Sequence, residues 1–200
     1  MKGVCTNTPR VLDRAFYARD PRVVARKLLN KVLVRSDGRS GRIVEVEAYC
    51  GVRDAAAHAY RGKTARNATM FGPAGHLYVY FSYGLHWSCN AVCGEVDEGV
   101  GVLLRALRPL TGLEAMRTAR LACQRDRDLC RGPARLCQAF GINGTNDGVD
   151  LVAGTGDLTI VDDGTPPPAH PVVSTRIGIA HAVAKPWRWY VSGSPYVSRK

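Results

Sequence analysis

The sequence contains no long apolar run and no secretion pattern. Its 200 residues include no stretch of about 18 consecutive apolar residues, so we expect no transmembrane helix. Residues 1–20 have neither the apolar core nor the small-residue cleavage site of a signal peptide. These absences indicate a cytoplasmic protein without a membrane-embedded segment.

The cysteines lack the spacing of a metal site. The seven residues are Cys5, Cys50, Cys89, Cys93, Cys123, Cys130 and Cys137. No two of them have the CxxC spacing of zinc sites, and no histidine cluster accompanies them. We therefore expect buried free thiols in a reducing compartment and no bound metal ion.

Acidic residues are scarce beside basic ones. The chain has 28 Lys and Arg against 17 Asp and Glu, a formal net charge of +11, and 22 of the basic residues are Arg. Guanidinium groups bind phosphate through paired hydrogen bonds, so this excess points to a polyanionic partner, either nucleic acid or a membrane surface. Codon bias in a GC-rich genome explains the arginine content equally well.

Composition and periodicity predict one α+β domain over residues 1–200, with residues 1–19 as a short N-terminal segment. Its sheet is expected to be antiparallel or mixed. Helices are expected in 20–35, where the helix runs into a strand, and at 111–122 and 133–140; further strands are expected at 42–49, 77–93, 100–108, 158–162 and 186–191. Asp20 and Thr111 are predicted N-caps, and Gly141 a C-cap. The polar loop 50–75 is long enough to suggest a function.

The strand over residues 42–49 carries two carboxylates. Strict alternation groups Glu45 and Glu47 with Ile43, opposite the core residues Val44 and Val46. Glutamate is disfavoured in strands, so the pair lies either on a solvated outer face or beside a cleft, where a carboxylate can act as a general base. A glycosidase that uses both carboxylates is disfavoured, because such groups face each other across a cleft.

Aromatic residues gather on the predicted hairpin at 77–93. Tyr78 and Tyr80 share one strand face, as core residues would. Tyr83 lies near the hairpin tip before a glycine, so we expect it to be exposed and able to wedge between nucleobases. In the long loop, His58 precedes a basic run that ends at Arg66, a candidate phosphate contact.

These segments together resemble the alkyladenine (3-methyladenine) DNA glycosylase family, the type shared by bacteria and vertebrates. The matching blocks, between about residues 20 and 198, are GRIVEVEAY, AAAHAYRGKTARNATMFGPAGHLYVYFSYGLHWSCN, GVLLRALRPLTGLEAMR, LCRGPARLCQAFGIN and KPWRWYVSGSPYVS. The resemblance implies an open barrel like the formyltransferase C-terminal domain, with surrounding helices and a protruding β-hairpin. It also implies a monomeric, nucleoid-associated enzyme of base excision repair that needs no cofactor.

The resemblance implies a role for each matching residue. The matches are Glu47 as the general base; Arg105 as a catalytic residue that helps to hold the water and the phosphate of the flipped nucleotide; Tyr49, His58, Tyr80 and Asn90 as the base pocket; Tyr83 as the side chain that fills the gap in the duplex; and Ala134 and Arg135 as phosphate contacts. Relatives carry Ser and Lys at the last two positions. Such an enzyme flips alkylated or deaminated purines out of double-stranded DNA and hydrolyses the N-glycosidic bond, leaving an abasic site.

One alternative uses the same surface without catalysis. A nucleic-acid-binding module would use the basic surface and the Tyr83 wedge and leave Glu47 idle. No lysine occurs in the EVEAY or YFSYG blocks, so a Schiff-base lyase step is not expected. The sequence leaves the preferred lesion open among 3-methyladenine, 7-methylguanine, hypoxanthine and ethenoadenine.

Overall fold

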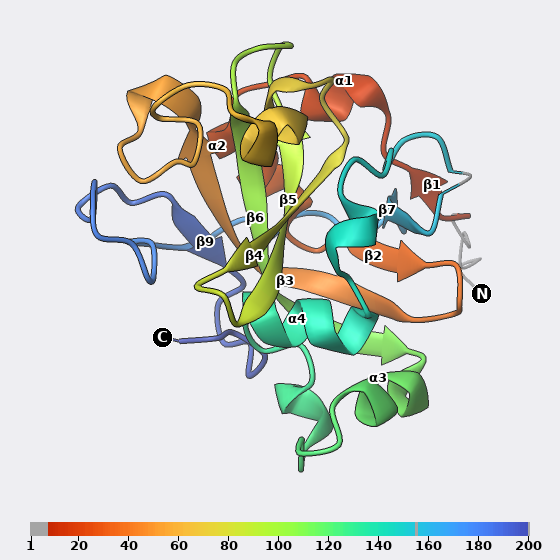
Figure 1. Ribbon diagram of the computed structural model, residues 1–200. Helices are drawn as coiled ribbons and strands as arrows, with labels where there is room; N and C mark the ends of the chain where they lie inside the picture. The colour runs from red at the N-terminus through yellow and green to blue at the C-terminus, as the bar shows by residue number, and fades with distance from the viewer. Residues whose placement is uncertain (1–7, 155, 200) are drawn as a thin grey trace.

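The strand that carries both glutamates, β3 (Ser40–Cys50), lies inside one antiparallel sheet. The computed structural model describes residues 8–154 and 156–199. The sheet has the order β1-β7-β2-β3-β6-β5-β4, and β9 pairs with β3 and β8. The other strands are β1 (Arg10–Val11), β2 (Val32–Arg35), β4 (Leu77–Ser82), β5 (His86–Cys93), β6 (Val100–Thr111), β7 (Leu158–Asp162), β8 (Val172–Ser174) and β9 (Arg188–Tyr190). Figure 1 shows the sheet curling into a half-barrel, which confirms the α+β prediction.

Short helices pack around this sheet. They are α1 (Arg14–Tyr17), α2 (Pro21–Leu28), α3 (Leu113–Ala119) and α4 (Pro133–Phe140), with 3₁₀ turns η1 (Gly51–Arg53), η2 (Ala65–Phe71), η3 (Asp126–Asp128) and η4 (Gly144–Asn146). α2 packs against β3 and β6, and α4 lies across β5 and β6 (Figure 1). The predicted cap at Asp20 is confirmed, because its carboxylate accepts from the Arg22 N–H at 2.8 Å. Gly141 likewise ends α4 in the left-handed conformation.

The predicted cap at Thr111 is wrong. β6 continues to Thr111, which pairs with Ser40 of β3, and the Thr111 hydroxyl donates to the Gly38 carbonyl at 2.7 Å. The pairing with β3 therefore extends the strand past the expected end at residue 108. α3 begins only at Leu113, after Gly112 turns the chain with a φ of 70°.

A bulge changes the expected alternation along β3. The pairing with β6 shifts between Ile43 and Glu45, and again between Glu45 and Val46. Ile43 consequently packs in the same core as Val46, on the opposite side from the one that strict alternation assigns to it. The second shift leaves Arg105 of β6 without a direct partner in the ladder.

Most of the cysteines are buried in the hydrophobic core. Cys50, Cys89, Cys93, Cys130 and Cys137 are buried, Cys123 is half-buried, and all six have free thiols; Cys5 lies outside the described residues. The main core takes side chains from the sheet, α2 and α4, and a second cluster under the long loop contains Tyr78 and Phe71. No helix in the described part of the chain is long and apolar enough to cross a membrane.

Candidate active site

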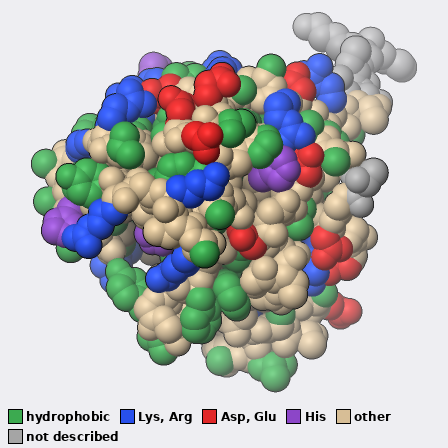
Figure 2. Space-filling view, turned by 45° about the horizontal axis from the view of Figure 1, so that its top comes forward, with side chains coloured by type: hydrophobic (Ala, Val, Ile, Leu, Met, Phe, Trp, Pro, Cys, Tyr) green, Lys and Arg blue, Asp and Glu red, His purple; other side chains and the backbone are tan. Residues whose placement is uncertain are grey.

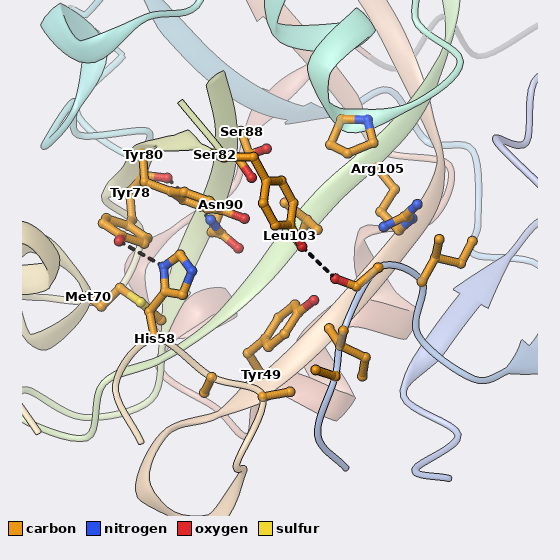
Figure 3. Close-up of a pocket in the computed structure, with 18 of the residues that line it drawn as sticks. Tyr49, His58, Met70, Tyr78, Tyr80, Ser82, Ser88, Asn90, Leu103 and Arg105 are labelled. Carbon is orange, nitrogen blue, oxygen red and sulfur yellow. Dashed lines mark hydrogen bonds between the residues drawn. The ribbon is translucent and has the colours of Figure 1, made fainter. Parts of the chain in front are cut away.

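A cavity of about 650 Å³ opens between the β4–β5 hairpin, the loop after β3 and the segment before β9. The structure brings together most of the predicted site residues in its wall: Tyr49, His58, Arg66, Tyr80, Tyr83, Asn90 and Arg105. Figure 3 shows Tyr49 on one side of this space and His58 with Tyr80 on another. Their positions come from three separate parts of the chain, which only the folded sheet brings together.

Aromatic residues line two sides of the cavity, with Tyr78, Tyr80 and His58 on one side and Tyr49 on the other, and the space between them is called the aromatic slot. Tyr78 and Tyr80 stack with ring centroids 5.5 Å apart and 23° between their planes. His58 stands edge-on to Tyr80 at 4.3 Å, and its Nδ1 lies 3.1 Å from the Tyr78 hydroxyl (Figure 3). Burial, with the nearby Arg66 cation, lowers the pKa of His58, so its imidazole is neutral at pH 7. Asn90 is buried beside this slot on β5.

Glu47 lies directly behind the cavity wall. Its side chain is fully buried, so the solvated outer face that the sequence left open is wrong. Its Oε2 accepts from the Tyr49 hydroxyl at 2.9 Å, and its Oε1 accepts from the Ile177 N–H at 2.8 Å and lies 3.1 Å from Arg105 Nη1. All three of these partners line the cavity. Burial raises the pKa of Glu47, although Arg105 and the two donors oppose the rise.

Glu45 has a different set of partners. Its Oε1 accepts from Arg105 Nε at 3.0 Å and from Arg188 Nε at 2.8 Å, while the N–H and hydroxyl of Ser198 donate at 2.6 and 2.8 Å. It is fully buried and does not line the cavity. The two carboxylates therefore do not face each other across a cleft, as the glycosidase alternative requires.

Tyr83 lies at the tip of the hairpin. Its side chain is 79% exposed, as predicted, and its backbone has a φ of 51°, which bulky residues rarely adopt. The hydroxyl donates to the Gly178 carbonyl at 3.0 Å, so the ring bridges the hairpin and the segment before β9.

The predicted phosphate contacts lie around this cavity. Arg66 is exposed at its rim and donates to the Phe81 carbonyl at 2.9 Å. Ala134 and Arg135 belong to the first turn of α4, which begins at the cavity-lining Pro133. Among the described residues, no side chain caps this turn, so the positive end of the helix dipole and the first N–H groups are not satisfied by a capping side chain.

Surface charge is mixed rather than gathered in one patch. Figure 2 shows basic side chains spread over the visible face, with acidic ones among them. Many arginines pair with aspartates, for example Arg42 with Asp163 at 2.6 Å and Arg117 with Asp126 at 2.6 Å. Within residues 8–154 and 156–199, no group of three or more His, Cys, Asp or Glu side chains is arranged to hold a metal ion.

Sequence comparison gives the family. The pattern of the family described as methylpurine-DNA glycosylase matches residues 15–195. The chain belongs to this family. A protein of Burkholderia lata named as a 3-methyladenine DNA glycosylase is 63% identical over 188 residues, 94% of this chain and 91% of the relative. Relatives with the same name from Koribacter versatilis (49% identical; 94% and 93% covered) and Carboxydothermus hydrogenoformans (45%; 95% and 100%) are also similar.

Sequence reasoning missed one wall of this DNA glycosylase's cavity. Residues 177–181, which lie between β8 and β9, line it, and Arg176 lies buried behind them. The segment has no strand or helix periodicity and contains a single glycine, so nothing local marks it. An arginine between β-branched residues, Thr175 and Ile177, was the only unusual feature.

Proposed function

We propose that this DNA glycosylase excises alkylated or deaminated purines with a water molecule that Glu47 activates. The observation that carries the proposal is a buried carboxylate directly behind an aromatic slot, with Arg105 bonded to it. A carboxylate whose pKa is raised by burial is suited to accept a proton near neutral pH.

The slot suits a planar base that has left the helix. Tyr49 and Tyr80 offer ring faces, and stacking returns about 1–3 kcal/mol per base against the few kcal/mol that flipping costs. Cation–π attraction adds to this for a positively charged alkylated purine. We assign to the His58 main-chain N–H a hydrogen bond with purine N7, and to Asn90 the rejection of a purine 2-amino group.

In the proposed reaction, the water oxygen bonds to C1′ of the sugar as the bond from C1′ to the base nitrogen breaks. Glu47 takes the proton from the water, and its charge stabilises the cationic sugar as the bond breaks. The base leaves with the bonding electron pair, and an abasic site remains. Tyr49, Arg105 and Ile177 bond to Glu47 and line the cavity in front of it, so we propose that at least one of them shifts when DNA binds and lets water reach the carboxylate.

The product distinguishes this proposal from a binding module. Incubation with a duplex that contains hypoxanthine, followed by alkali, is expected to cut the strand at the lesion, and omission of alkali is expected to leave it intact. The absence of strand breaks for hypoxanthine, 3-methyladenine, 7-methylguanine and ethenoadenine at any enzyme excess would favour the non-catalytic module. Cuts before alkali would instead indicate a lyase step.

We also propose that the protein acts as a monomer on double-stranded DNA in the bacterial cytoplasm, near the nucleoid. The support is the family's DNA substrate together with the net charge of +11. Sedimentation of the protein with and without a short duplex tests the monomer, and a dimer in either sample would contradict it.

A further inference from the structure

Three consecutive residues between β8 and β9, 176–178, each bond to a different part of the site. The Arg176 side chain binds the loop after β3. The Ile177 N–H donates to Glu47, and the Gly178 carbonyl accepts from Tyr83. A short stretch of backbone therefore connects the pocket loop, the proposed base and the hairpin tip.

Arg176 is a buried cation with a neutralising partner. Its Nη1 and Nη2 donate to the Asp54 carboxylate at 2.5 and 2.8 Å, and both side chains are fully buried. Nη1 also donates to the Ala48 carbonyl at 3.0 Å. The guanidinium carbon lies 4.7 Å from the ring centroid of Tyr49 and 5.2 Å from that of Trp187. The arginine thus contacts Tyr49 without itself lining the cavity.

The ion pair joins two walls of the cavity. Asp54 directly precedes the lining residues 55–58, and Arg176 directly precedes the lining residues 177–181. Asp54 also accepts from the Cys50 N–H, at 3.3 Å, which fixes its carboxylate relative to the end of β3. A bidentate arginine–carboxylate pair has one preferred geometry, so it holds the two walls in register.

We propose that Arg176 is a positioning residue for excision, which holds the Ile177 N–H on Glu47 and supports Tyr49 from behind. The inference rests on the proposed function, because it needs Glu47 to be the base. Arg176 touches neither the cavity nor the reacting atoms and acts only through its neighbours.

The consequence is a change in how Glu47 titrates. Charged and polar groups from four parts of the chain act on its carboxylate. They are Arg105 from β6, Glu45 and Tyr49 from β3, Tyr80 from β4, and Arg176 with the Ile177 N–H from the segment before β9. Arg188 of β9 pairs with Glu47 along the backbone, but its side chain binds Glu45. Loss of Arg176 removes a cation and loosens a donor, and both changes raise the pKa of Glu47. A base works only when deprotonated, so the acid limb of the rate profile moves to higher pH.

Single-turnover excision of hypoxanthine from a duplex, measured against pH with enzyme in excess, tests the proposal. Arg176→Gln removes the cation, and the double variant D54N/R176Q also avoids an unpaired buried carboxylate. We expect the double variant to have a plateau rate about 10- to 100-fold lower, an acid limb at higher pH and unchanged affinity for undamaged DNA. Arg42→Gln, which breaks the ion pair with Asp163, is the matched control and is expected to behave as wild type.

A folded double variant whose pH profile superimposes on that of wild type overturns the proposal. Equal losses of rate and of affinity for undamaged DNA also overturn it, because they mark a purely structural role. If neither glutamine variant folds, Arg176→Lys decides, because it keeps the cation but loses the bidentate pairing with Asp54. A lower plateau rate with unchanged affinity for undamaged DNA supports the proposal, and a wild-type plateau rate overturns it. Glu47→Gln in the same assay separates the two hypotheses. If Glu47→Gln still excises hypoxanthine, the proposed role of Glu47 is refuted. If Glu47→Gln loses excision while the D54N/R176Q variant behaves as wild type, only the proposed role of Arg176 is refuted.

Discussion

Glu45 and Glu47 are two positions apart on β3 and equally buried, but their carboxylates have different hydrogen-bond and ion-pair partners. Glu45 neutralises Arg105 and Arg188 and accepts twice from Ser198, so its carboxylate accepts four hydrogen bonds from the protein. The carboxylate of Glu47 bonds to Tyr49, Arg105 and Ile177, all of which line the cavity. One carboxylate organises the arginine and the C-terminal residues, and the other is the one for which we propose a catalytic role.

Glu47→Gln is expected to fold, bind DNA and flip the lesion, but to lose excision. The amide keeps the size and one acceptor oxygen but cannot accept a proton from water, and general-base assistance is worth about 10² to 10⁴ in rate. Single-turnover excision of hypoxanthine measures the loss.

Glu45→Gln is the control on the same strand. Loss of its charge leaves two buried arginines with less compensation, so we expect the free energy of unfolding in urea to fall by about 3 kcal/mol. Excision by the folded fraction should fall clearly less than in Glu47→Gln. Wild-type-like excision by Glu47→Gln, within about tenfold, beside an inactive Glu45→Gln would move the base to Glu45.

The pH dependence of wild-type excision is also set at this residue. Burial raises the pKa of Glu47, and the base form is lost as pH falls through that raised value. We therefore expect excision of hypoxanthine to decline on the acid side at a pH above the ordinary range for glutamate. A rate that stays constant down to pH 4 would contradict a buried general base.

At the scale of elements, the hairpin β4–β5 and the helix α4 were predictable because their signals are local. A tyrosine before a glycine marks the tip, and Pro133 and Gly141 mark the ends of α4. The alternation along β3 was not fully predictable, because the bulge beside Ile43 depends on β6 rather than on its own residues. The exposed position of Tyr83 and its use as a wedge were predicted from its place before a glycine, whereas the choice of Glu47 over Glu45 came from the family resemblance. The segment 177–181 entered neither argument.

Tyr83 gives the element-scale prediction. Tyr83→Ala removes the ring that would fill the gap in the duplex, so a fluorescent base analogue is expected to report a smaller flipped population, with non-specific binding less affected. Tyr83→Phe keeps the ring and loses only the hydrogen bond to Gly178, so its flipping should match that of wild type. An unchanged flipping equilibrium in Tyr83→Ala would exclude insertion of this side chain.

For the whole molecule, the net charge is larger than the number of basic side chains that are free to contact DNA phosphates. Several arginines are occupied by internal ion pairs, such as those with Asp54, Asp163 and Glu45. Near the cavity, Arg66 and Arg135 are exposed and form no ion pair within the described residues, so they are available to phosphates. The useful charge is therefore a few groups around the cavity rather than the full +11.

The salt dependence of DNA binding measures that useful charge. If about four to six phosphates are neutralised, log Kd against log salt concentration is expected to have a slope of magnitude about 4 to 5, because each neutralised phosphate releases about 0.9 of a counterion. Arg135→Ala should lower the magnitude by about 1, since it removes one phosphate contact without altering a base contact. Arg42→Ala should leave it unchanged, because Arg42 already pairs with Asp163. A wild-type magnitude below about 2 would mean that the basic surface is not used on DNA, and binding would then depend on the aromatic slot and Tyr83 alone.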